Sequence, residues 1–313
     1  MLAIVSPGQG AQTPQMFEAW LANPRVNEIL TSYSQFVGLD LIQLGTTAGA
    51  QDIKQTQISQ PLIVAASLMT AELLDLTELK FDQNSVVLAG HSVGEFVAAY
   101  LSGAISLSAA LGLVAARGSA MSAAAKLNSE TGMSAVLGGD KDQVISHLRS
   151  LELIAANVNA SGQVVAAGLS SNLQKLSEAP LEGTRVRALD VSAAFHTDFM
   201  SSAKNDLTAL FRETTFSDPI LNIISNKDGQ IVSTGKDLRE KLLNQIDSPV
   251  RWDLCQKYFV NQKVTGLLEL APGGVLTGIA KREVPDAELF SIKTPSDIEN
   301  AKEFIKTHAK VNP

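Results

Sequence analysis

The sequence has few cysteines and histidines and no run of basic residues. Its single cysteine, Cys255, excludes an internal disulfide, and neither it nor the four histidines fall at the spacing of a metal site. A net charge of -7 argues against a nucleic-acid surface. The N-terminus lacks the basic segment and the long apolar run of a signal peptide, and we expect no membrane-spanning segment. These absences predict a cytoplasmic protein with neither nucleic acid nor membrane as a partner.

One stretch, residues 85–96, carries the strongest functional signal. It is an apolar, β-branched run that stops at Gly90, turns through Ser92 and resumes as a helix after Gly94. Glycine on both sides lets the strand and helix approach closely, as a nucleophile elbow requires. Ser92 is therefore a candidate nucleophile, and the alternative is a structural turn. The N–H of the next residue, Val93, would be the first donor of an oxyanion hole.

A second loop stands near the N-terminus. Residues 2–5 read as a buried strand, and Pro7-Gly8-Gln9-Gly10 follows as a glycine-rich loop. The loop lacks the G-x-G-x-x-G pattern of a dinucleotide site, and a plain tight turn is the alternative. If the two strands are neighbours, the Gln9 backbone N–H could be the second oxyanion donor.

The four histidines are the candidates for the general base. His91 must point away from Ser92, His147 lies on a charged amphipathic helix, and His308 belongs to the polar C-terminal segment. His196 is the best candidate by elimination.

The third member of a triad is harder to find. The acidic candidates between nucleophile and base are Asp140, Asp142 and Asp190, and all fall inside or at the end of the inserted segment described below. A carboxylate triad is therefore doubtful, and a serine–histidine dyad is the better hypothesis.

Two further features have two interpretations each. Arg117 lies on a helix that Ser106 caps, among small residues and without an acidic partner three or four positions away. It is either an exposed arginine or one aimed into a pocket to hold a carboxylate. Gly273-Gly274 before a helix could cradle an anion, or it could be a close-packed turn.

The periodicity between residues 132 and 191 gives the order β-α-β-β-α-β, which is a ferredoxin-like arrangement. We therefore predict an α/β protein with two parts. The larger, residues 1–125 and 193–313, is an α/β-hydrolase-like catalytic domain with a parallel sheet and the nucleophile elbow. The smaller, residues 126–192, is an inserted ferredoxin-like subdomain.

Five ordered blocks then carry a family resemblance. Along the chain they are Pro7-Gly8-Gln9-Gly10, Gly90-His91-Ser92-Val93-Gly94-Glu95, Arg117-Gly118 with Met121, Ala194-Phe195-His196, and Asn244-Gln245 ahead of Pro249-Val250-Arg251-Trp252. Together they resemble the malonyl-CoA:acyl carrier protein transacylases over the whole chain.

The resemblance implies roles for these residues. Ser92 would be the nucleophile, His196 its base, and Arg117 the group that binds the free malonyl carboxylate. Gln9 and Val93 would supply the oxyanion-hole N–H groups, and the backbone carbonyl of Gln245 would orient the histidine in place of an aspartate.

The resemblance also implies a reaction and its partners. Malonyl would pass from malonyl-CoA through a malonyl-serine to the phosphopantetheine thiol of acyl carrier protein, by a monomer that needs no cofactor. The alternatives are an acyltransferase serving a polyketide synthase, a serine thioesterase or other hydrolase, and a carrier-binding module without activity.

Overall fold

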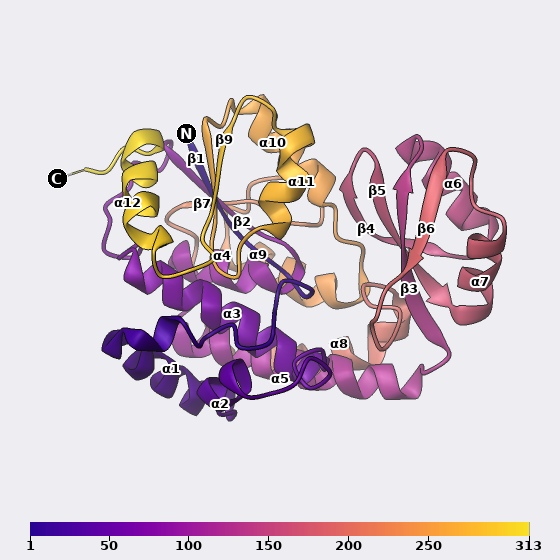
Figure 1. Ribbon diagram of the computed structural model, residues 1–313, viewed down its shortest axis with the longest axis horizontal. Helices are drawn as coiled ribbons and strands as arrows, with labels where there is room; N and C mark the ends of the chain where they lie inside the picture. Colours follow the sequence, from indigo (N-terminus) through magenta and orange to yellow (C-terminus); the bar gives the residue numbers. More distant parts are fainter. Residues whose placement is uncertain (313) are drawn as a thin grey trace.

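The computed structural model describes residues 1–312, which form two sheets and the helices around them (Figure 1). The larger sheet is parallel throughout, in the order β7-β2-β1-β8-β9. Its strands are β1 (Leu2–Ser6), β2 (Val86–Gly90), β7 (Asn222–Ile223), β8 (Gly266–Glu269) and β9 (Glu288–Ser291). The predicted α/β class with a parallel sheet is confirmed, although β9 was not predicted.

Both faces of this sheet are buried, which explains why its strands are continuous apolar runs. Along β1, Leu2 and Ile4 belong to one core cluster, and Ala3 and Val5 belong to another on the opposite face. The second cluster includes Trp252, which lies at the start of α10.

Helices cover the sheet on both faces (Figure 1). They are η1 (Trp20–Ala22), α1 (Pro24–Val37), α2 (Leu41–Thr46), α3 (Thr56–Leu73), η2 (Ser92–Gly94), α4 (Glu95–Leu101), α5 (Leu107–Leu127), η3 (Asp198–Met200), α8 (Ser201–Glu213), α9 (Gly235–Asn244), η4 (Gln245–Asp247), α10 (Trp252–Asn261), α11 (Val275–Glu283) and α12 (Asp297–His308). Helix α3 contains Pro61 in its interior, five residues after its first residue, Thr56.

Helix α5 is long and apolar enough to pass for a membrane span by length and composition. No such segment was expected from the sequence. Half of its most apolar window is buried inside the protein. It packs against α3, α8 and α1, so it serves here as a core helix.

The second sheet is antiparallel and lies to the right in Figure 1. Its elements are β3 (Thr131–Gly138), α6 (Lys141–Ser150), β4 (Ile154–Ala160), β5 (Gln163–Leu169), α7 (Ser170–Glu178) and β6 (Thr184–Ala188). The strand order β4-β5-β3-β6 is that of a split βαβ arrangement, and the predicted order of elements is confirmed. The domain limits at 125/126 and 192/193 stay a prediction, and the first of them falls in the last turn of α5.

Backbone hydrogen bonds tie the small sheet to the catalytic part. The N–H of Val158 donates to the carbonyl of Val250 at 2.9 Å, and the N–H of Val250 donates to the carbonyl of Ala156 at 2.9 Å. This bridge joins β4 to the segment between η4 and α10. The walls of the cleft between the two sheets are thereby fixed relative to each other.

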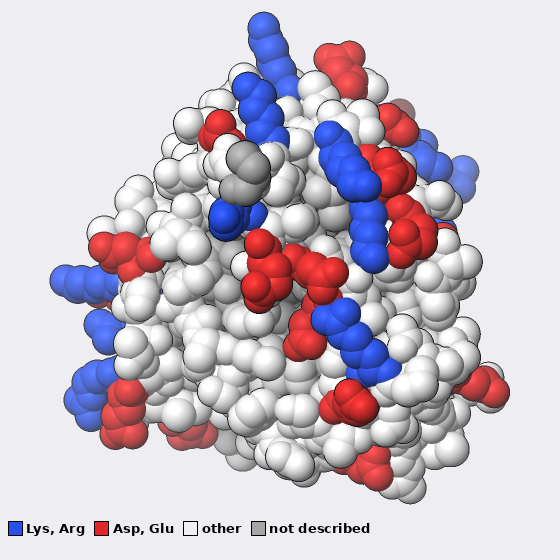
Figure 2. All heavy atoms as spheres, turned by 90° about the vertical axis from the view of Figure 1, so that its left-hand side faces the viewer, with Lys and Arg blue, Asp and Glu red and all other residues white. Residues whose placement is uncertain are grey.

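The face at the left of Figure 1, which includes α12, carries basic and acidic side chains intermixed (Figure 2). Several of them form ion pairs along a helix, such as Lys302 with Glu299 and Lys306 with Glu303 on α12. Neighbouring charges of opposite sign cancel at a distance, so this face presents no extended basic patch to a polyanion.

Candidate active site

The elbow around Ser92 is built by close backbone contact. A Cβ at Gly94 would lie 2.3 Å from the carbonyl oxygen of Ser6 in β1, and one at Gly90 would lie 1.9 Å from the carbonyl carbon of Gly94. Both positions therefore require glycine, as the sequence predicted. Ser92 adopts a left-handed backbone with φ of 53°, which is unusual for a non-glycine residue and common at strained functional turns.

Ser92 and His196 meet at hydrogen-bonding distance. Ser92 Oγ lies 2.8 Å from His196 Nε2, and His196 Nδ1 lies 2.8 Å from the backbone oxygen of Gln245. Because a carbonyl oxygen can only accept, the proton belongs on Nδ1, and Nε2 is left free to accept from the serine hydroxyl. The geometry is that of a nucleophile with its base.

Within residues 1–312, His196 Nδ1 contacts the backbone oxygen of Gln245 and not a carboxylate. Asp140 caps α6, and Asp190 forms an ion pair with Lys54. Burial, and then the nearby charge of Arg117, lower the pKa of His196 to about 3. The imidazole is therefore neutral, in the form that can accept a proton.

Arg117 is fully buried, so its interpretation as an exposed residue is wrong. Its Nη1 donates to Gln60 Oε1 at 2.7 Å, and its Nη2 donates to Gln245 Oε1 at 2.9 Å and to Ser92 Oγ at 3.2 Å. Burial lowers its pKa to about 10, and Nε has no hydrogen-bond partner among residues 1–312. The guanidinium remains charged and is held by neutral oxygens.

Close packing of α5 on α3 positions the side chain of Arg117. Gly118 follows Arg117, and a Cβ there would lie 2.9 Å from the carbonyl oxygen of Thr56. Gly118 therefore serves helix contact, which a hydropathy pattern does not distinguish from an exposed face.

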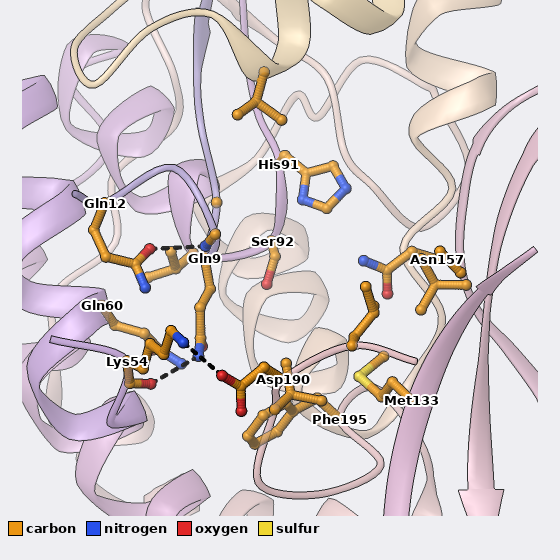
Figure 3. A pocket seen from close by; sticks show the side chains of 18 of the residues that line it. Gln9, Gln12, Lys54, Gln60, His91, Ser92, Met133, Asn157, Asp190 and Phe195 are labelled. Carbon is orange, nitrogen blue, oxygen red and sulfur yellow. Dashed lines mark hydrogen bonds and ion pairs between the residues drawn. The ribbon is translucent and has the colours of Figure 1, made fainter. Parts of the chain in front are cut away.

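Gln9 lies across from the elbow because β1 and β2 are neighbours, with Ser6 opposite Gly90. It lines the same cavity as Ser92 and Val93 (Figure 3). Its side-chain Nε2 donates to the carbonyl of Lys54 at 3.4 Å, whereas its backbone N–H makes no hydrogen bond within residues 1–312. That N–H is available to a ligand.

The cavity has a volume of about 400 Å³, within the range of small-molecule sites. One wall is the loop after β1 and the elbow. The facing wall comes from β3, β4 and β5, with Met133 and Asn157 pointing inward (Figure 3). Helix α11 adds Val275, Leu276 and Ile279. Arg117 is not among the lining residues and lies behind Ser92 and Gln60.

Sequence reasoning missed two buried residues that brace the elbow. Asn226 Oδ1 accepts from the N–H of Ser92 at 2.7 Å, and Asn226 Nδ2 donates to the carbonyl of Gly90 at 2.7 Å. Glu95 Oε1 in turn accepts from the N–H of Asn226 at 2.7 Å. Glu95 stands inside the elbow motif, so its position was a usable signal, whereas Asn226 reads as an ordinary turn residue.

The turn at Gly273-Gly274 does bind an anion, and that anion is part of the chain. The carboxylate of Glu269, fully buried at the end of β8, accepts from the N–H groups of Gly274, Leu276 and Thr277 at 2.8 to 2.9 Å. The N-terminus of α11 is therefore already occupied. Within residues 1–312, no group of three or more His, Cys, Asp and Glu side chains could hold a metal ion.

Comparisons with known proteins agree with this geometry. The family model described as "Acyl transferase domain" matches residues 4–302. The "Malonyl CoA-acyl carrier protein transacylase" of Mycobacterium bovis is 42% identical over 299 residues, covering 96% of this chain and 98% of the relative.

Solved structures agree as well. The crystal structure of MCAT from Mycobacterium tuberculosis superimposes with a TM-score of 0.91 at 41% identity, covering 96% of this chain and 99% of that one. A malonyl-transacylase in complex with a type II PKS acyl-carrier protein superimposes with a TM-score of 0.89 at 28% identity, covering 96% and 99%.

Proposed function

This chain belongs to the acyl transferase domain family, and we propose that the residues around Ser92 transfer a malonyl group through a serine ester. The protein is an acyltransferase that moves malonyl from malonyl-CoA to the phosphopantetheine thiol of acyl carrier protein. The observation that carries the proposed route is the chain of contacts from Arg117 Nη2 through Ser92 Oγ to His196 Nε2.

In the first half-reaction, His196 Nε2 takes the proton of the Ser92 hydroxyl as Oγ attacks the thioester carbon. The Nδ1–H bond to the Gln245 carbonyl stabilises the imidazolium that forms. The oxyanion points toward the backbone N–H groups of Gln9 and Val93. Collapse of the tetrahedral intermediate breaks the carbon–sulfur bond, and the imidazolium returns its proton to the leaving coenzyme A thiolate.

Arg117 is proposed to hold the free carboxylate of the malonyl group. In the free protein, Nη2 donates to Ser92 Oγ, so the guanidinium stands beside the atom that becomes acylated. The ester oxygen formed on acylation is a weaker acceptor than the hydroxyl, which frees Nη2 for the carboxylate. An acetyl group offers no anion and would leave this buried charge unpaired.

In the second half-reaction, the carrier's thiol gives its proton to His196 and attacks the malonyl-serine, which regenerates Ser92. The route uses only side chains and backbone groups of this chain and the two substrates, without a cofactor. We propose that the carrier serves fatty-acid chain elongation. The similarity to a transacylase in complex with a type II PKS carrier keeps polyketide synthesis as the second candidate.

The protein's setting is also a proposal. We propose a monomer that works in the cytoplasm, with neither a membrane nor nucleic acid as a partner. The net charge of -7 argues against nucleic acid as a partner, and a single buried free cysteine fits a reducing compartment such as the cytoplasm.

Intact-mass measurement after brief mixing with malonyl-CoA tests the route. We expect a malonyl adduct on the wild-type protein and none on Ser92→Ala. Ser102→Ala is the matched control, because Ser102 is a fully buried serine at the end of α4, and it should retain the adduct. An adduct that persists on Ser92→Ala would refute the assignment of the nucleophile. Release of free malonate without carrier would favour the hydrolase alternative.

A further inference from the structure

The side chain of Gln245 links two buried ionisable groups, Arg117 and Glu95. Its Oε1 accepts from Arg117 Nη2 at 2.9 Å, while its Nε2 donates to Glu95 Oε2 and to the carbonyl of Ser92, the latter at 3.1 Å. Arg117 is fully buried and Glu95 is 2% exposed. The amide thus relays a hydrogen bond from the arginine to the carboxylate.

An amide can be placed in two orientations, and its neighbours decide which one is stable. Glu95 accepts at both oxygens, from the N–H of Asn226 and from Gln245. No acceptor for a proton on Glu95 is found within residues 1–312, and both of its oxygens act as acceptors in this arrangement. Burial raises the pKa of Glu95 to about 8, even against the opposing effects of these two donors and the charges of Arg117 and Lys241.

This arrangement avoids competition between Glu95 and the substrate for the donors of Arg117. A carboxylate bonded directly to Arg117 would balance its charge but would compete with the malonyl carboxylate for the same donors. Glu95 lies one amide away, so it accepts from Gln245 without occupying the guanidinium. Because Glu95 accepts from the amide nitrogen of Gln245, the amide oxygen of Gln245 faces Arg117.

We propose that Glu95 is a positioning residue for substrate choice: through the side-chain amide of Gln245 it holds Arg117 beside Ser92 and so favours malonyl over acetyl. The inference rests on the proposed role of Arg117. It assigns the side chain of Gln245 a function separate from that of its backbone carbonyl, which holds His196.

Glu95→Gln tests this with almost no change in volume. The new side chain can still accept from Asn226, but its NH₂ then faces the NH₂ of Gln245. If Gln245 turns over to relieve this, it presents a donor to Arg117. Because Arg117 would lose a hydrogen bond to a charged group, we expect the malonyl-to-acetyl ratio of kcat/KM to fall at least about tenfold. Most of that fall should come from malonyl.

Three further variants isolate the relay. Gln245→Met removes the amide but keeps the backbone carbonyl, and it should lower the ratio similarly even if Glu95→Gln folds poorly. In an Arg117→Met background, Glu95→Gln should have no further effect on the ratio. Glu72→Gln is the matched control, because this carboxylate accepts from Tyr33 away from the site and should leave the ratio unchanged.

The outcomes separate this inference from the proposed function. If wild-type protein forms a malonyl adduct but folded Glu95→Gln loses malonyl and acetyl transfer equally, Glu95 supports the elbow only and the inference is wrong. A full effect of Glu95→Gln without Arg117 would also overturn it. If wild-type protein forms no malonyl adduct, the proposed function fails and the inference fails with it.

Discussion

Arg117→Met separates the charge of the buried guanidinium from its bulk. Methionine fills much of the same volume but cannot pair with a carboxylate. Removing one partner of a buried charge pair costs about 3–5 kcal/mol, which corresponds to roughly a 10²- to nearly 10⁴-fold loss of kcat/KM for malonyl-CoA. Arg117 is fully buried, so solvent can compensate little for the lost pair.

Acetyl-CoA gives the internal comparison for this variant, because its acyl group makes no such pair. We expect acetyl transfer by Arg117→Met to fall much less than malonyl transfer, or to rise. The assay is single-turnover loading of Ser92, followed by intact mass with each thioester, and thermal melting verifies that the variant is folded. Arg25→Met is the control, since Arg25 is half-exposed and pairs with Asp75 on the surface. Equal losses for malonyl and acetyl would refute the carboxylate role.

Two other predictions follow from the site. Because burial and Arg117 lower the pKa of His196 to about 3, single-turnover acylation between pH 8 and pH 5 should show no midpoint near the ordinary 6.5, and such a midpoint would contradict a neutral buried base. Between about pH 3 and 6.5, His196 binds a proton in the unfolded chain but not in the folded one, so it makes the free energy of unfolding decrease as the pH drops below 6.5. In denaturant titrations, His196→Asn should flatten this dependence of the free energy of unfolding on pH. Gly94→Ala should fail to fold or melt far below the wild type, because its Cβ would lie 2.3 Å from the Ser6 oxygen. Gly112→Ala is the control: no atom lies within 4 Å of its new Cβ, and it should raise the free energy of unfolding by about 1 kcal/mol. Equal melting temperatures of the two variants would contradict the packing argument.

The elbow could be predicted from sequence because its requirements are local. A strand, a sharp turn and a helix within residues 85–96 leave few alternatives for Ser92, and the contacts at Gly94 are made by the adjacent strand. His196 could be found because the chain has few histidines. These inferences needed no knowledge of distant residues.

The surroundings of Arg117 could not be predicted in the same way. Its partners Gln60 and Gln245 lie 57 and 128 positions away, and nothing in their local sequence marks them as polar contacts. Helix α5 is apolar over most of its surface, so it offers no polar stripe that would place the arginine outside or inside. Burial here is decided by how α3 and α5 pack, and that is a tertiary property.

The charge of Arg117 acts on both partners of the proposed catalytic pair, Ser92 and His196. It stabilises negative charge on Ser92 Oγ, 3.2 Å away, but it also lowers the pKa of His196 and so weakens the base. A base works best when its pKa lies near the working pH, and burial already takes His196 far below that range. A malonyl carboxylate on Arg117 cancels the repulsion felt by the imidazolium, so it makes proton transfer from Ser92 easier. An acetyl group leaves that repulsion in place. Selection for malonyl should therefore be expressed in the rate of acylation as well as in binding, because the substrate's own charge completes the electrostatics that the base requires.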